Sequence, residues 1–208
     1  PATPQVEQWL ALRTHAWARG RSFEDIQLTP HHLAQLDVSH CPVTRDLLGD
    51  DNRSIDRVRD AAGYAAGNLA VMAQRANRAK ADRGHQALND MAASCAAGPI
   101  TRIGGLCEAD WERLSVLASF VTPLHHEAAA QIPLRVLPPN RLRLFNPIQA
   151  LQAFVTRQLA TPGWSARLSR VEALLPTDAL RTDFNRFLLA LAPRVLAATE
   201  LQEPHEIR

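Results

Sequence analysis

The stretch from Ser54 to Arg83, SIDRVRDAAGYAAGNLAVMAQRANRAKADR, constrains the fold of this chain more than any other. Ile55–Val58 and Leu69–Met72 are short runs rich in β-branched or apolar residues, each of strand length, and a Gly-containing segment separates them. A basic, helix-like segment opens at Gln74, and we expect it to end near Ala81. The order strand, loop, strand, helix predicts a compact ββα unit.

The composition is that of a folded chain rich in helix. With 208 residues, 46% of them apolar and 21% charged, the chain can bury one or two compact cores, which excludes a disordered protein. Aromatic residues make up only 5%, and Ala and Leu are abundant, which favours helices over a β-sandwich or barrel. The longest apolar runs are far shorter than the roughly 20 residues of a membrane span, so we expect no membrane partner.

The cysteines exclude one kind of metal site. Cys41, Cys95 and Cys107 are odd in number, far apart and without a C-x-x-C pair. This pattern rules out a four-cysteine zinc knuckle and argues against a disulfide framework. The first residues, PATPQVEQW, contain no basic region followed by an apolar one, so nothing marks secretion. We therefore expect a cytoplasmic protein.

The remaining helices are predicted from apolar periodicity and capping signals. One helix should run from about Val6 to Gly20, and Thr29-Pro30 should start a short one. Tryptophans at helix-face positions, Trp9, Trp17, Trp111 and Trp164, are expected in the core. Later helices are expected over 110–120, after Pro123, Asn146-Pro147 and Thr161-Pro162, and from Thr177, with an extended connector over 132–144.

The predicted fold class is α+β and mostly helical, with a break at Gly98-Pro99. Residues 1–97 should form a helical lead-in plus the ββα unit, which spans about 38–85. Residues 100–208 should form a helical region that ends in a C-terminal bundle. Its last helix is expected to bury Leu180, Phe184, Phe187, Leu188 and Leu191.

Oxygen ligands in the ββα segment suggest a site for a hard cation. Asp56 supplies a carboxylate at the end of one strand, and Asn77 an amide oxygen on the following helix. Such oxygens suit Mg²⁺ or Mn²⁺, which keep several waters when they bind protein. Asn68 could brace the loop through bonds to backbone groups, although a hairpin turn favours Asn after Gly67 for its own sake. Asn77 taken alone is equally an ordinary surface residue of a helix.

Basic side chains surround these oxygens. Residues 51–86 carry seven basic and four acidic side chains, a net charge of +3, whereas the whole chain carries +2. Arg is well suited to bidentate contacts with phosphate, so this segment predicts a phosphate-binding surface. The candidate phosphate-binding residues are Arg53, Arg59, Arg75, Arg78 and Lys80.

The run SIDRV…GY…GNLAVM…ANRAK resembles the HNH, or ββα-metal (His-Me finger), nuclease superfamily, over about 45 of the 208 residues. The resemblance implies a ββα fold that hydrolyses phosphodiester bonds with a bound Mg²⁺ or Mn²⁺. It implies that Asp56 and Asn77 hold the metal and that Asn68 takes the part of the middle Asn. The residue that follows Asp56 would then be the general base.

That residue is Arg57, where active members of the superfamily have His. Arg has a pKa above 12 and cannot accept a proton from water. The nearest histidines, His40 and His85, lie just outside the motif. The motif thus favours phosphate binding over hydrolysis, with Arg57 beside the phosphate as a charge and not as a base.

The sequence therefore leaves two functions open. The first is an HNH-like protein that binds DNA or RNA and either cleaves it with Mg²⁺ or Mn²⁺ or only binds it. The second is a non-enzymatic interaction protein, in which the C-terminal helices dock a protein partner and the ββα unit is a catalytically dead relic. A contiguous exposed apolar patch on those helices would favour the second.

Overall fold

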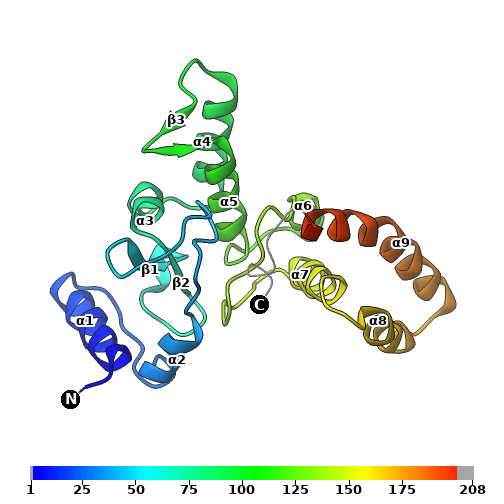
Figure 1. Ribbon diagram of the computed structural model, residues 1–208, viewed down its shortest axis with the longest axis horizontal. Coiled ribbons are helices and arrows are strands. Elements are labelled where there is room, and N and C mark those ends of the chain that lie inside the picture. Colours follow the sequence, from blue (N-terminus) through cyan, green and yellow to red (C-terminus); the bar gives the residue numbers. More distant parts are fainter. Residues whose placement is uncertain (1, 201–208) are drawn as a thin grey trace. The chain divides into compact units, whose positions relative to one another are not determined.

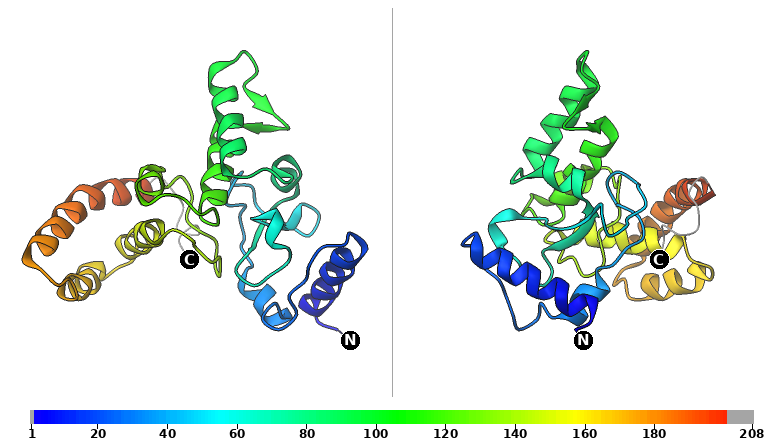
Figure 2. Two further views of the ribbon diagram at one scale, coloured as in Figure 1. Left: turned by 180° about the vertical axis from the view of Figure 1, so that it is seen from behind. Right: turned by 60° about the vertical axis from the view of Figure 1, so that its left-hand side comes forward.

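The structure is a computed structural model that describes residues 2–200, without the side chains of 194 and 196–200. The chain is α+β and divides into two compact units, Pro1–Gln149 and Ala150–Arg208. Figures 1 and 2 show the elements in three views. In chain order they are α1 Pro4–Ala18, α2 Pro30–Gln35, β1 Arg53–Arg57, the 3₁₀ turn η1 Asp60–Ala62, β2 Leu69–Ala73, α3 Gln74–Lys80, α4 His85–Ala97, β3 Arg102–Ile103, β4 Leu106–Cys107, α5 Glu108–Ser119, α6 His126–Gln131, α7 Pro147–Leu159, α8 Trp164–Ala173 and α9 Asp178–Glu200.

Capping residues start the two N-terminal helices. The Thr29 side chain accepts a hydrogen bond from the amide of His32, and Pro30 follows as the first helical residue, so the predicted start of α2 is confirmed.

On α1, Trp9 packs edge-on against Phe23. The expectation that Trp17 lies in the core is wrong, because its side chain is 83% exposed. Trp17 is in the last turn of α1, next to the turn at Gly20.

The predicted order of two strands and a helix is confirmed. β1 and β2 form an antiparallel hairpin whose register runs from Arg53 opposite Ala73 to Arg57 opposite Leu69. Every residue of β2 is buried, which explains its continuous apolar run. α3 follows β2 directly and packs on both strands, as Figure 1 shows. The hairpin and helix therefore form one small layered unit inside the first core.

The helices α4 and α5 pack against each other along their length, with the β3–β4 hairpin between them in sequence (Figure 1). Trp111 on α5 is 1% exposed, and its indole N–H donates to the carbonyl of Ile103 at 3.2 Å. Gly98-Pro99 is thus a local break between two packed helices. The units divide at Gln149/Ala150 and not near 97–100, because the core of the first unit reaches from α1 to Leu142.

The expected connector over 132–144 contains no helix or strand. α6 begins at His126 and not at Pro123. Asn146 is 4% exposed and makes hydrogen bonds to Ser119, Thr122, Leu124 and Gln149, which fix the end of this connector on the first unit.

The second unit is helical and has a small core. Val155, Leu159, Leu168, Leu188 and Val195 form it. Leu188 is buried as predicted, but the predicted burial of Leu180 and Phe187 is wrong, since they are 47% and 39% exposed. Over the described residues, α9 packs mainly against α8, which leaves part of its apolar surface uncovered. The last eight positions of the predicted region 100–208 lie outside the described residues.

Over residues 2–200, no helix combines the length and the apolar character that crossing a membrane requires.

Candidate functional site

Asp56 lies on the face of β1 that α3 covers, and it is paired there with Lys80. The Lys80 Nζ is 3.1 Å from the Asp56 Oδ1, and the two side chains are 0% and 5% exposed. The same ammonium donates to the backbone carbonyls of Arg57 at 2.9 Å and Ala81 at 3.4 Å. Lys80 is the last residue of α3, so its charge lies at the end of the helix that favours a cation. The predicted phosphate-binding role of Lys80 does not fit this buried position.

The Asp56 carboxylate is only half satisfied. Its Oδ2 is buried and has no hydrogen-bond partner. Burial raises the pKa of Asp56 to about 6, although the Lys80 ammonium, the hydrogen bond from it and the charge of Arg57 oppose the rise. At neutral pH the carboxylate is therefore ionised, and Asp56 and Lys80 form a buried ion pair with one free acceptor.

Asn77 lies on α3 on the side that faces β1. Its Nδ2 donates to the Ser54 Oγ at 3.2 Å and the Ile55 carbonyl at 3.5 Å. Side chains alternate along a strand, so Ser54 and Asp56 share the face toward α3 and Arg57 points to the other face. The structure thus brings Asp56 and Asn77 to one face, as predicted, and separates them from the side chain of Arg57.

Asn68 holds the loop between the strands, as predicted. Its Oδ1 accepts from the backbone amide of Arg59, and its Nδ2 donates to the carbonyls of Arg59 and Gly63. These bonds close the loop around Gly63, which has a φ of +65°. A Cβ at Gly63 would lie 2.0 Å from the Ser22 Oγ and 2.7 Å from the Ser22 carbonyl oxygen, so only glycine fits there.

Arg57 belongs to a cluster that sequence reasoning did not identify. Its guanidinium is 2.5 Å from the Asp60 carboxylate and stacks over the Tyr64 ring at 5.0 Å. The Tyr64 hydroxyl is 3.2 Å from the Nδ1 of His15 on α1. Desolvation, followed by the charges of Arg19 and Arg57, lowers the pKa of His15, so its imidazole is neutral at neutral pH. No local spacing links His15 to the motif, because 42 residues separate it from Arg57.

Apart from the buried Lys80, the predicted phosphate-binding residues divide into two groups. Arg53 forms an ion pair with Asp37 at 2.5 Å. Arg75 makes a bidentate contact with Asp46, in which its Nε and Nη2 each donate to a carboxylate oxygen at 3.0 Å. Their charges are therefore largely neutralised. Arg59 and Arg78 are exposed, and over the described part of the chain neither forms an ion pair. Only these two of the five predicted residues offer a free cation to solvent.

The two nearby histidines do not reach the Asp56 carboxylate through any hydrogen bond in the described residues. The His85 ring bonds to the backbone and side chain of Ser115 on α5, and the His40 ring bonds to Ser39. Among residues 2–200, moreover, His, Cys, Asp and Glu side chains do not gather in threes that would hold a metal. Asn77 is not one of these four side-chain types, so the Asp56–Asn77 pair is a separate case.

A divalent metal does not fit between Asp56 and Asn77 as they lie. The unpartnered Oδ2 of Asp56 is a suitable ligand, but the Lys80 ammonium already bonds the other carboxylate oxygen. A divalent cation beside this ammonium would meet like-charge repulsion at a distance of a few ångströms, in a region from which water is excluded. Metal binding here would first require Lys80 to leave its buried position.

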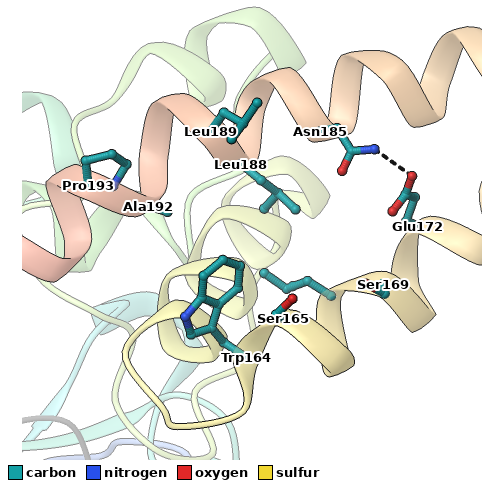
Figure 3. Close-up of a pocket in the computed structure, with 10 residues that line it drawn as sticks. Trp164, Ser165, Ser169, Glu172, Asn185, Leu188, Leu189, Ala192 and Pro193 are labelled. Carbon is teal, nitrogen blue, oxygen red and sulfur yellow. Dashed lines mark hydrogen bonds between the residues drawn. The ribbon is translucent and has the colours of Figure 1, made fainter.

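The second unit contains an open apolar pocket of about 360 Å³ between α8 and α9. Figure 3 shows Trp164 from α8 facing Leu188 and Ala192 from α9, with a hydrogen bond of 2.6 Å from Asn185 to Glu172 at one end. Leu168 of α8 also lines the pocket. Leu189 beside it is 78% exposed. Most of the pocket's surface is apolar, which suits the binding of an apolar group.

Comparisons of this chain with family models, with curated proteins and with solved structures find no match. The case for any function therefore depends on the chain's own residues.

Proposed function

We propose that the first unit binds nucleic acid through an HNH-like ββα unit in which Lys80 takes the place of a divalent metal. The observation that carries the replacement of the metal is the buried pair of Lys80 and Asp56, with a separation of 3.1 Å. The exposed Arg59 and Arg78 support the binding itself. In the superfamily that the sequence resembles, Asp56 and Asn77 would be metal ligands. Here the carboxylate receives its positive partner from the protein itself.

The same arrangement argues against hydrolysis as the main activity. Metal-assisted hydrolysis needs a cation that contacts the scissile phosphate and a base that takes a proton from water. The Lys80 ammonium is 0% exposed and cannot reach a phosphate, and Arg57 cannot act as a base. Binding requires neither group, since exposed arginines such as Arg59 and Arg78 can contact the phosphate backbone directly.

The experiment is a binding titration against labelled DNA and RNA oligonucleotides in EDTA, followed by fluorescence anisotropy. We expect binding whose affinity falls steeply as salt is raised, because phosphate contacts release counterions. EDTA removes divalent metal ions, so any metal-dependent cleavage is prevented and binding alone is measured. Failure to bind any of the oligonucleotides at low salt would remove the proposal.

Cleavage is a second candidate, which the orphaned Oδ2 of Asp56 favours. A plasmid-nicking assay with Mg²⁺ or Mn²⁺ tests it, with EDTA and Asp56→Ala as controls. If Lys80 replaces the metal, no nicking is expected in either metal. Nicking that disappears in both controls would instead establish a metal-dependent endonuclease and would require Lys80 to move.

Protein interaction is the alternative function, and the pocket between α8 and α9 favours it. Its apolar lining and the exposed Leu189 are what an interaction surface would show. Leu189→Asp should then reduce association with a partner or a second copy, as measured by light scattering or pull-down. Nucleic-acid binding by the first unit would be unchanged in that variant.

A further inference from the structure

The connector that precedes α7 carries a row of outward-facing side chains. Arg141, Arg143 and Phe145 are exposed, and they alternate with Leu142 and Asn146, which are 6% and 4% exposed. The buried residues between them anchor the row on the first unit. The alternation of Arg and Leu in the sequence therefore describes one polar and one packed side of a single segment.

This row lies directly beside the β1–β2 loop. The amide of Arg143 donates to the Gly67 carbonyl at 2.8 Å, and the amide of Phe145 donates to the Phe120 carbonyl at 2.8 Å. A Cβ at Gly67 would lie 3.0 Å from the Arg143 Cβ, and Gly67 has a φ of +87°. Gly67 thus permits a close approach between two segments that are more than seventy residues apart in the sequence.

Arg59 completes the surface from the other side of the loop. Its backbone amide is fixed by Asn68, and its guanidinium stacks over the Phe145 ring at 5.7 Å. Within the part of the chain that the structure describes, no carboxylate pairs with Arg59, Arg141 or Arg143. They differ in this from Arg53 and Arg75, whose charges Asp37 and Asp46 neutralise.

We propose that Arg59, Arg141, Arg143 and Phe145 form a binding surface for an unpaired nucleic-acid strand. This inference rests on the proposed nucleic-acid binding and identifies where it occurs. Unpaired arginines in a row attract a phosphate backbone, and Arg is the side chain best suited to hold its oxygens. The exposed ring of Phe145 and the planar Arg59 guanidinium offer stacking surfaces for bases. Stacking of this kind needs a base whose face is free, which an unpaired strand provides and a duplex does not.

The surface uses only one of the residues that the motif marked. Arg141, Arg143 and Phe145 lie in the C-terminal half of the sequence, outside the stretch that resembles the superfamily. The binding surface therefore does not depend on the catalytic groups of the ββα unit.

The test compares four proteins by anisotropy with a mixed-sequence single-stranded DNA oligonucleotide in EDTA. They are the wild type, Arg141→Gln/Arg143→Gln, Phe145→Leu and the control Arg135→Gln. Arg135 is in the same connector, but it pairs with Glu112 at 3.5 Å. All four substituted side chains are at least partly exposed, so the variants should fold, and circular dichroism would check this.

We expect the double variant to bind at least about tenfold more weakly and to lower the salt slope by about 1.4, which corresponds to two phosphate contacts on a single strand. Phe145→Leu should weaken binding about fivefold or more, and Arg135→Gln should bind like the wild type. Duplex DNA and single-stranded RNA of the same sequence serve as further arms. Weaker binding of the duplex is expected, and the RNA strand should bind about as well as the DNA strand, because phosphates and base faces are common to both.

The failures can be told apart. If the wild type binds the strand and the double variant binds it equally well, the surface is wrong and the proposed function remains. If the wild type binds no strand and no duplex, the proposed function falls together with the surface. A duplex that binds more tightly than the single strand would overturn the preference for an unpaired strand.

Discussion

The β1–β2–α3 unit and the α8–α9 pair differ in which side chains they bury. In the first, even charged groups are buried: Asp56 and Lys80 lie between strand and helix with almost no exposed surface. In the second, even large apolar groups face solvent, with Leu189 at 78% and Leu174 at 83% exposure. The first region therefore depends on the correct pairing of a few polar groups. The second depends on a handful of apolar contacts and leaves apolar surface uncovered.

The largest expected effect comes from removing one partner of the buried pair. Lys80→Met keeps most of the side chain's length but leaves the Asp56 carboxylate uncompensated, which should lower the free energy of unfolding by about 3–5 kcal/mol at neutral pH. Urea denaturation measures this. The double variant Asp56→Asn/Lys80→Met removes both charges and should regain most of the loss. A double variant as unstable as the sum of the two single ones would show that the pair is not coupled.

Gly63 in the β1–β2 loop offers a second test of close packing in the first region. Gly63→Ala should destabilise by about 2–4 kcal/mol, because it adds the strain of a positive φ to an overlap with the Ser22 carbonyl. Gly84→Ala is the matched control, since nothing lies within 4 Å of its Cβ and its φ is −86°. Equal melting temperatures of the two variants would contradict the tight turn.

In the second region, neighbouring leucines should differ sharply. Leu188→Ala removes a side chain that is 8% exposed and should cost about 2–3 kcal/mol, whereas Leu189→Ala should change stability by less than about 0.5 kcal/mol. Thermal denaturation of both variants gives the comparison. A large loss in Leu189→Ala would mean that this side chain is covered in solution, and the contrast between the two regions would weaken.

The smallest expected effect is a pH dependence. The pKa of Asp56 is raised to about 6 in the folded protein, so the folded state binds this proton more tightly than the unfolded state. The resulting stabilisation is full below the unfolded pKa and is lost as pH rises through about 6. Relative to Asp56→Asn, the wild type should lose on the order of 1–2 kcal/mol between about pH 4.5 and pH 7. A wild type that gains stability relative to the variant over this window would contradict the raised pKa.

Local signals in the sequence predicted the elements well. Thr29 with Pro30, and the run from Leu69 into Gln74, each determine a boundary through contacts within a few residues. Asn68 was expected to brace its loop and does so, because its partners Arg59 and Gly63 lie within nine residues. The α+β class follows from these local patterns.

Packing between distant segments was not predictable in this way. Lys80 looked like one more surface cation of a basic helix, and its burial depends on Asp56, 24 residues earlier on another element. Gly98-Pro99 is a strong local break, but α4 and α5 pack across it and move the division of the chain to Gln149. The position of Arg141 and Arg143 beside the β1–β2 loop depends on the contact of the connector with Gly67, which no local pattern in the sequence indicates.

The central claim is that Lys80 is the cation of the Asp56 site. Calorimetric titration of Mn²⁺ into the wild type, Asp56→Ala and Lys80→Met tests it most directly, with circular dichroism to verify folding. We expect no Asp56-dependent binding by the wild type up to about 1 mM Mn²⁺, and binding that appears in Lys80→Met as the carboxylate is freed. Binding of Mn²⁺ by the wild type that is lost in Asp56→Ala would contradict the claim and restore a metal site.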